Sequence, residues 1–373
     1  MQGEQRRSID ELTGLRGLAA LWVALYHLRT LLPAYPDAVE AILGHGYLAV
    51  DIFFALSGFI LYTTYFEKFR TLSPRGYVQF VIKRLARIYP AHAATMLLFL
   101  MLPVAILLFS EAKDLGDRYD PGDYVLALLL VQNWGFTDNL NWNFPSWSIS
   151  TEFFAYLLFP FLALAFQRVL RSIVGGLIVS AAAYIAVFLV FDLNGEPSLS
   201  GSIPTLGLPR CVLEFIAGMA AASLFARIGS NRRHAVGWAA LAASAGLFAS
   251  LGFGVQDYAV APLAGSLLVA GLACELPAFR GLRHKAAVYL GEISYSIYIL
   301  HIFIRELFQF VLTDATGEMS WLVAALYVVV LIAGAAVMYE LVEKPVRGAV
   351  VRWSAERFSR KRVDTAAREG QSA

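Results

Sequence analysis

Long runs of apolar residues dominate this 373-residue chain. Windows of about 19 residues pick out runs of about 20 residues, the length that an α-helix needs to cross the hydrocarbon layer of a membrane. Soluble domains average about 45–50% apolar and about 25% charged residues, whereas this chain has 58% hydrophobic and 16% charged residues. The sequence therefore predicts an all-α integral membrane protein with ten transmembrane helices, at 14–32, 45–64, 89–110, 146–167, 172–191, 207–226, 235–253, 258–276, 287–310 and 320–342.

A further apolar segment, 123–136, is short for a span, which favours a re-entrant or interfacial segment between the third and fourth helices. Basic residues gather in the cytoplasmic connections of membrane proteins. With the N-terminus inside and ten crossings, 25 of the 30 Lys and Arg residues lie on the cytoplasmic side. Counting 123–136 as a full span would move most of the later basic loops outside. We therefore expect both termini to be cytoplasmic, with a transmembrane domain over 1–345 and a disordered basic tail over 346–373.

Composition excludes several other classes of protein. Cys211 and Cys274 are the only cysteines, and both lie in apolar runs, so the chain is no disulfide scaffold. The net charge of +2 conceals the asymmetry of the basic residues and gives no indication of nucleic-acid binding. We recognise no soluble catalytic domain and expect no metal, so any chemistry is expected inside the membrane.

Ionisable residues within the predicted spans are the first candidates for function, because each costs at least about 2.5–3.5 kcal/mol on insertion scales. A rise of about 1.5 Å per residue places His27, Asp51, Glu152 and His301 at one level in the outer half of the membrane. If their faces converge, a histidine can act as a general base and a carboxylate as its orienting partner. The interpretation without catalysis treats the histidines as packed side chains and the carboxylates as structural partners of polar neighbours or of Arg210.

A second polar cluster is predicted at the cytoplasmic ends of the first and third helices, where Arg16 meets the Lys83, Arg84 and Arg87 of KRLARIYP. Arg84 and Arg87 are three residues apart, hence on one helix face, and guanidinium groups match phosphate oxygens. The pattern indicates a phosphorylated donor that enters from the cytoplasm. The alternative is ordinary anchoring by positive residues. Glu343 is expected to form a salt bridge to this cluster.

Six ordered strings between Glu11 and Arg347 resemble the successive motifs of the membrane acyltransferase 3 family: ELTGLRGLAALWVALYH, YLAVDIFFALSGFILY, RLARIYP, PSWSISTEFFAYLLFP, LGEISYSIYILHI and LVEKPVR. The resemblance implies an O-acyltransferase of the standalone form, without an SGNH-type esterase domain, in the bacterial inner membrane. It implies transfer of an acyl group, commonly acetyl, from cytoplasmic acyl-CoA (acetyl-CoA) to a hydroxyl of a cell-surface or exported glycan. The implied partners are acyl-CoA, a glycan or lipid-linked glycan acceptor, membrane lipids and polysaccharide assembly machinery.

The resemblance also implies which residues form the site. Matched residue by residue, the family's motifs fall on Arg16 and His27, on Arg84 and Arg87, on Ser57, Gly58 and Phe59, on Trp147, Ser148 and Glu152, and on Tyr298 and His301. The arginines are expected to hold the CoA phosphates, and His27 to be the general base, with Glu152 or Asp51 fixing its tautomer. Ser57 and Gly58 are expected to allow close helix approach.

Several alternatives remain open at this level. Donors for the developing oxyanion, or contacts to the substrate, are expected from Trp147, Ser148, Tyr298 or His301. A covalent acyl-histidine route is an alternative to direct transfer, and the acceptor is alternatively a small molecule or a lipid. From a different class, a proton-coupled transporter also uses intramembrane histidines and carboxylates, although no internal repeat supports it. A non-catalytic membrane partner is the last alternative.

Overall fold

A computed structural model of the protein describes residues 2–109, 115–313 and 317–371, with side chains described for 10–109, 115–313 and 317–358. This part of the chain contains helices and loops and no strand. The α-helices are α1 (Gln2–Leu28), α2 (Asp37–Leu43), α3 (Ala49–Tyr65), α4 (Pro74–Phe99), α5 (Met101–Phe109), α6 (Pro121–Leu128), α7 (Trp147–Phe166), α8 (Ile173–Leu193), α9 (Ile203–Phe225), α10 (Arg233–Ser250), α11 (Asp257–Leu272), α12 (Lys285–Glu292), α13 (Ser294–Leu312), α14 (Trp321–Met338) and α15 (Lys344–Gln371).

Eight helices among the described residues are long and apolar enough to cross a membrane. The number rises to nine if α11 and the 3-10 turn Pro277–Arg283, which meet at 91°, form one broken span. Helix α1 does not qualify, because charged residues fill much of its first half and Arg16 and His27 interrupt the rest. Each of the ten predicted ranges overlaps a helix, but the predicted count of ten crossings is not confirmed. The all-helical architecture with membrane-spanning helices is confirmed.

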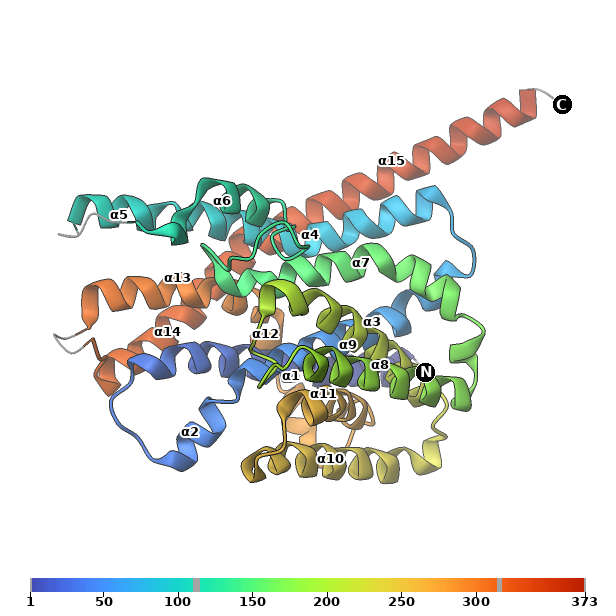
Figure 1. Ribbon diagram of the computed structural model, residues 1–373. Helices are drawn as coiled ribbons and strands as arrows, with labels where there is room; N and C mark the ends of the chain where they lie inside the picture. Colours follow the sequence, from blue (N-terminus) through green and yellow to red (C-terminus); the bar gives the residue numbers. More distant parts are fainter. Residues whose placement is uncertain (1, 110–114, 314–316, 372–373) are drawn as a thin grey trace.

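The long helices lie roughly side by side, with α10 along one edge of the bundle and α4 and α15 along the opposite edge (Figure 1). The start of α1 and the end of α15 point to the same side of the bundle (Figure 1). This placement suits a chain whose two ends share one compartment, and their cytoplasmic location stays a prediction. Met1 and residues 372–373 of the predicted tail lie outside the described residues.

Two of the predicted apolar segments are interrupted in the structure. The range 287–310, predicted as one helix, is divided at Ile293 into α12 and α13. The division accompanies tight packing on α1, since a Cβ at Gly291 would lie 1.8 Å from the Thr13 carbonyl oxygen. The segment 123–136 is helical only as far as Leu128, and Leu130 takes a left-handed conformation with φ of 60°. It is therefore too short a helix to span a membrane, as the sequence predicts.

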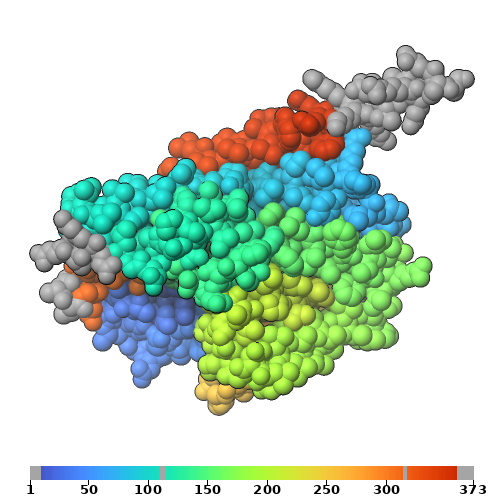
Figure 2. All heavy atoms as spheres, turned by 45° about the horizontal axis from the view of Figure 1, so that its top comes forward, coloured from blue at the N-terminus to red at the C-terminus, as the bar shows by residue number. Residues whose placement is uncertain are grey.

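The basic segment after Pro345 also differs from its prediction. We expected a disordered tail, whereas the backbone runs as helix α15 to Gln371. Its Ala, Glu, Arg and Lys residues are strong helix formers, and its first part lies along α4 (Figure 2). There the Arg75 guanidinium lies 5.6 Å from the centre of the Phe358 ring. Contact with α4 thus supports the first part of this helix.

Helices α3 and α9 approach each other unusually closely, through two glycines. A Cβ at Gly58 on α3 would lie 1.9 Å from the Phe215 carbonyl oxygen, and one at Gly218 on α9 would lie 2.0 Å from the Ala55 carbonyl oxygen. Small residues allow such contact between membrane helices, where packing replaces the hydrophobic effect as the main attraction. The prediction that Gly58 permits close helix approach is therefore confirmed.

We expect Gly58→Ala to lower the thermal unfolding temperature of the detergent-solubilised protein. The added methyl overpacks the α3–α9 contact, a change that typically costs about 1–3 kcal/mol. The matched control is Gly246→Ala in α10, where a Cβ would meet no atom within 4 Å and where alanine favours the helix. Equal unfolding temperatures for the two variants would contradict this account of the contact.

Candidate active site

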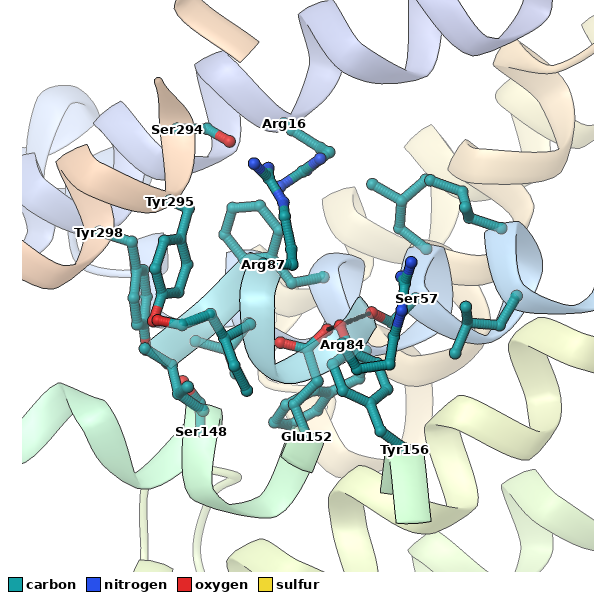
Figure 3. Close-up of a pocket in the computed structure, with 18 residues that line it drawn as sticks. Arg16, Ser57, Arg84, Arg87, Ser148, Glu152, Tyr156, Ser294, Tyr295 and Tyr298 are labelled. Carbon is teal, nitrogen blue, oxygen red and sulfur yellow. Dashed lines mark hydrogen bonds between the residues drawn. The ribbon is translucent and has the colours of Figure 1, made fainter. Parts of the chain in front are cut away.

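A cavity of about 120 Å³ lies between five helices that are distant in the sequence: α1, α3, α4, α7 and α13 (Figure 3). Its apolar wall includes Phe53 and Phe54 of α3. Its polar lining consists of Arg16, Ser57, Arg84, Arg87, Ser148, Glu152, Tyr156, Ser294, Tyr295 and Tyr298. Many of these are motif residues, so the structure brings most of the motifs to one place. We call this cavity the arginine pocket.

Three guanidinium groups converge on the arginine pocket, from Arg16 on α1 and from Arg84 and Arg87 on α4 (Figure 3). Arg87 forms an ion pair with the buried Glu343, which confirms the predicted salt bridge. Within the described residues, Arg16 and Arg84 have no ion pair. With Glu152 as the one carboxylate in the lining, the pocket carries an excess of positive charge. Such a site favours an anionic group, above all one with phosphate oxygens.

Arg84 is held by aromatic rings rather than by a carboxylate. Its guanidinium lies 5.3 Å from the centre of the Tyr65 ring and 5.8 Å from that of Tyr156. It also donates a long hydrogen bond of 3.4 Å to the Tyr65 hydroxyl, while its Nε is buried without a hydrogen-bond partner among the described residues. Cation–π contacts position the charge without neutralising it, so Arg84 keeps donors to offer a ligand.

Glu152 lies in the arginine pocket, on the face of α7 that meets α3. Its Oε1 accepts a hydrogen bond from the Ser57 hydroxyl and another, of 2.6 Å, from the Tyr156 hydroxyl. Tyr156 follows Glu152 by four residues, a spacing that places both on one helix face. The spacing is visible in the sequence and could have identified Tyr156 as a partner of Glu152, but we did not predict Tyr156 as a site residue. Ser57 likewise serves as a partner of Glu152 rather than as a small residue alone.

Asp51 faces α9 and is paired with Arg210. The Arg210 Nη2 lies 2.7 Å from both carboxylate oxygens, and its Nε lies 2.9 Å from Oδ1. Glu214 lies 3.4 Å away from the same guanidinium, and Trp147 packs its ring at 5.7 Å from it. All these groups are buried. Asp51 and Trp147 therefore belong to a buried polar core beside the arginine pocket. The contacts of Asp51 match the alternative in which this carboxylate is a structural partner of Arg210.

His27 and His301 lie against each other at the end of α1. Their rings are stacked, with centroids 5.1 Å apart, and Phe144 covers the other edge of His27 at 5.1 Å. The His301 Nδ1 lies 2.5 Å from the Tyr298 carbonyl oxygen, so we assign the proton to Nδ1. The His301 Nε2 is then a buried lone pair, with no hydrogen-bond partner among the described residues. We call these residues the histidine pair.

The predicted single cluster of four titratable groups is divided into three. The two histidines meet, but Asp51 is paired with Arg210 and Glu152 with Ser57 and Tyr156. Among the hydrogen bonds of the described residues, none joins the His27 imidazole to either carboxylate. The cause lies in height as well as direction, because Glu152 bonds to Ser57 and lines the arginine pocket with Arg16, and eleven residues of α1, about 16 Å of helix, separate Arg16 from His27. The predicted carboxylate partner of His27 is thus not observed.

Hydroxyl groups link the arginine pocket to the histidine pair. The Ser148 and Tyr298 hydroxyl oxygens are 2.7 Å apart, and both residues line the pocket. The Tyr298 ring lies 5.6 Å from that of His301, one turn further along α13. The Tyr298 hydroxyl also donates to the Pro145 carbonyl oxygen at 3.0 Å. Polar groups therefore extend from the arginines to the histidines.

Phe59 does not line the arginine pocket. It packs on Phe225 with ring centroids 5.6 Å apart, so its role is structural.

Arg305, for which we predicted no role from the sequence, holds the end of α1. Its Nε donates to the His27 carbonyl oxygen at 2.8 Å, and its Nη2 donates to the Thr30 hydroxyl at 3.1 Å. The neighbouring Glu306 accepts two hydrogen bonds from Arg118, of 2.8 and 3.1 Å. Arg305 follows His301 by four residues, and this i, i+4 spacing could have identified Arg305 as a neighbour of the site.

Within the described residues, no group of three or more His, Cys, Asp or Glu lies close enough to hold a metal ion.

We expect Asp51→Asn and Arg210→Met each to lower the unfolding temperature strongly, because removing one partner of a buried ion pair typically costs about 3–5 kcal/mol. The double variant Asp51→Asn/Arg210→Met should recover part of this loss, since neither charge of the pair then stays buried without the other. The loss that remains reflects the buried Glu214, which also contacts Arg210. Thermal unfolding in detergent measures the cycle. If Asp51→Asn left the unfolding temperature unchanged, the ion pair would not be the structural element described above.

Comparison with known proteins places the chain in a family. The family model described as an acyltransferase domain matches residues 9–340. Acyltransferase MdmB of Streptomyces mycarofaciens is 30% identical over 325 residues, which is 79% of this chain and 78% of that protein. Protein 2 in picA locus of Rhizobium radiobacter is 35% identical over 153 residues, covering 38% of this chain and 75% of that protein.

A third relative, the peptidoglycan O-acetyltransferase OatA of Listeria monocytogenes, is 29% identical over 206 residues, covering 50% of this chain and 30% of that protein. No solved structure matches the chain. The family model covers most of the chain, including all the motif residues of the arginine pocket and the histidine pair. The protein therefore belongs to the acyltransferase 3 family.

Proposed function

We propose that this acyltransferase takes an acyl group, usually acetyl, from cytoplasmic acyl-CoA and transfers it to a hydroxyl of a cell-surface or exported glycan. The observation that carries the proposal is the arginine pocket, in which Arg16 and Arg84 have no ion pair among the described residues and from which Ser148 and Tyr298 lead to the histidine pair. The relatives include proteins named as O-acetyltransferases, one of them for peptidoglycan. These names support a hydroxyl acceptor on a glycan.

The donor side of the proposal rests on charge. Arg16 and Arg84 offer guanidinium donors, and such groups bind phosphate oxygens in a bidentate manner. Arg87 is oriented by its ion pair with Glu343. The CoA phosphates would occupy this end of the site, and the pantetheine arm would carry the thioester past Ser148 and Tyr298. With ten crossings and both termini cytoplasmic, the arginines lie at the inner side of the bacterial inner membrane.

The acceptor side of the proposal rests on the histidine pair. His27 takes the proton of the acceptor hydroxyl, and the oxygen attacks the thioester carbonyl carbon. The carbon–sulfur bond breaks, the acyl group stays on the acceptor, and the CoA thiolate takes the proton from His27. Ser148 or Tyr298 supplies a hydroxyl donor to the oxyanion. Since neither predicted carboxylate contacts His27, His301 is the neighbour that keeps this imidazole in place.

The partners follow from the same proposal. The acceptor is a glycan or a lipid-linked glycan unit, presented by polysaccharide assembly machinery, in contact with membrane lipids. A small hydroxylated molecule or a lipid is the competing acceptor. An assay with candidate acceptors of each class, using radiolabelled acetyl-CoA and purified protein, tells them apart by which product carries the label.

In that assay we expect His27→Ala to lower kcat by about 10²–10⁴-fold, the usual contribution of a general base. Arg84→Ala should raise KM for acetyl-CoA about tenfold or more, since about 1.4 kcal/mol of lost binding corresponds to a factor of ten. The control is Gly246→Ala, far from both groups. Full transfer by His27→Ala would refute the assignment of the base. Substrate flux into vesicles without any consumption of acetyl-CoA would instead favour a transporter.

Arg305→Gln should lower kcat with little change in KM for acetyl-CoA. The substitution removes the guanidinium that holds the His27 carbonyl oxygen, so it displaces the end of α1 while leaving the arginine pocket intact. Arg305→Lys, which keeps one donor, should restore part of the rate. A rise in KM without a change in kcat would show that Arg305 acts on the donor and not through His27.

A further inference from the structure

A second cavity, of about 490 Å³, lies between α4 and α15 and has no part in the site described so far. Helix α4 contributes Arg75, Gln79 and Lys83 to it, and the facing wall from α15 includes Ser354 and Phe358. We call it the α4–α15 groove. It is larger than the arginine pocket, and its polar side chains all carry hydrogen-bond donors.

The groove and the arginine pocket are both lined by α4, although no single residue lines both. Arg75, Gln79 and Lys83 follow one another at intervals of four residues, and so does Arg87, which lines the pocket. At 3.6 residues per turn, each step of four residues shifts by about 40° around the helix, and twelve residues cover about 18 Å along its axis and about a third of a turn around it. The donors therefore form a row that winds along α4 from the groove towards the arginine pocket.

Among the described residues, no carboxylate pairs with the charges of the groove. Arg75 and Lys83 have no ion pair within the part of the chain that the structure describes. The α15 wall contributes no carboxylate, since its lining residues are Val351, Ser354, Ala355 and Phe358. A cavity with two cations and an amide suits a phosphate group. The Phe358 ring with the Arg75 guanidinium at 5.6 Å adds the kind of surface on which a nucleobase stacks.

We infer that the α4–α15 groove binds the nucleotide end of the CoA donor, with its ribose 3′-phosphate held by Arg75 and Lys83. This inference rests on the proposed function, because it assigns a second part of the same donor. The molecule then follows α4 to Arg87, where its diphosphate and thioester arm enter the arginine pocket. Helix α15 forms one wall of the donor site, which gives the basic segment after Pro345 a role in substrate binding.

A phosphate in this groove has two conceivable sources, a nucleotide or the headgroup of an anionic lipid. The 3′-phosphate separates them, because dephospho-CoA lacks only this group. We therefore compare the binding of CoA and dephospho-CoA to the full chain by isothermal titration calorimetry, in nanodiscs of phosphatidylcholine alone. A second set of nanodiscs contains phosphatidic acid, whose headgroup is also a phosphate monoester.

In phosphatidylcholine nanodiscs, the unsubstituted protein should bind CoA at least about tenfold more tightly than dephospho-CoA. Arg75→Gln and Lys83→Gln should each reduce this ratio, and the double variant should bind the two compounds about equally. The charge-matched control is Arg357→Gln, on the exposed side of α15, where the guanidinium lies over Trp353. It should preserve the ratio. Thermal unfolding of each variant shows whether the fold is intact.

Equal binding of CoA and dephospho-CoA by the unsubstituted protein would overturn the inference, while tight binding that depends on Arg84 would leave the proposed function standing. If neither CoA nor dephospho-CoA bound, the result would contradict both this inference and the proposed function. If phosphatidic acid raised the unfolding temperature only when Arg75 and Lys83 were present, and the two compounds bound equally, the groove would be a lipid site. That result also contradicts the inference.

Discussion

The ion pair between Asp51 and Arg210 fixes the helix on which the candidate site is built. Unpaired charges in the membrane interior are costly, and here two of them satisfy each other at 2.7 Å. The same two helices touch through Gly58 and Gly218. With α3 clamped to α9 on one side, its other side, including Ser57, forms a wall of the arginine pocket. Asp51, which the sequence suggests for catalysis, thus belongs to an ion pair that holds two helices together.

The polar groups that remain form two functional zones joined by hydroxyls. Arg16 and Arg84 of the arginine pocket have no ion pair among the described residues, and the Nε2 of His301 in the histidine pair is buried there without a hydrogen-bond partner. Ser148 and Tyr298 lie between them, with their oxygens 2.7 Å apart. This order, from anion-binding groups to a base, matches the shape of a donor with phosphates at one end and a reactive thioester at the other. The proposed function requires one donor molecule to reach both zones, with its phosphates at the arginines and its thioester at the histidines.

Much of this arrangement was predictable from the sequence, and the failures share one cause. Apolar run length located most helices, the spacing of Arg84 and Arg87 placed both on one face, and Gly58 and Glu343 behaved as expected. Depth counted along each helix was expected to bring Asp51 and Glu152 level with His27, but it fixes neither the offset between neighbouring helices nor the neighbour that a side chain faces. The division at Ile293 depends on contact with α1. Hydropathy and periodicity alone encode neither the neighbour that a side chain faces nor a helix break that depends on contact with another helix.

The central claim is that one donor molecule spans the arginine pocket and reaches the histidine pair. A cryo-electron microscopy structure of the full chain with a non-hydrolysable thioether analogue of acetyl-CoA tests it most directly. The account predicts phosphate density within hydrogen-bonding distance of Arg16 and Arg84, and the thioether carbonyl beyond Tyr298, beside His27 and His301. An analogue bound outside the pocket, or bound with its acyl end at the arginines, would contradict it.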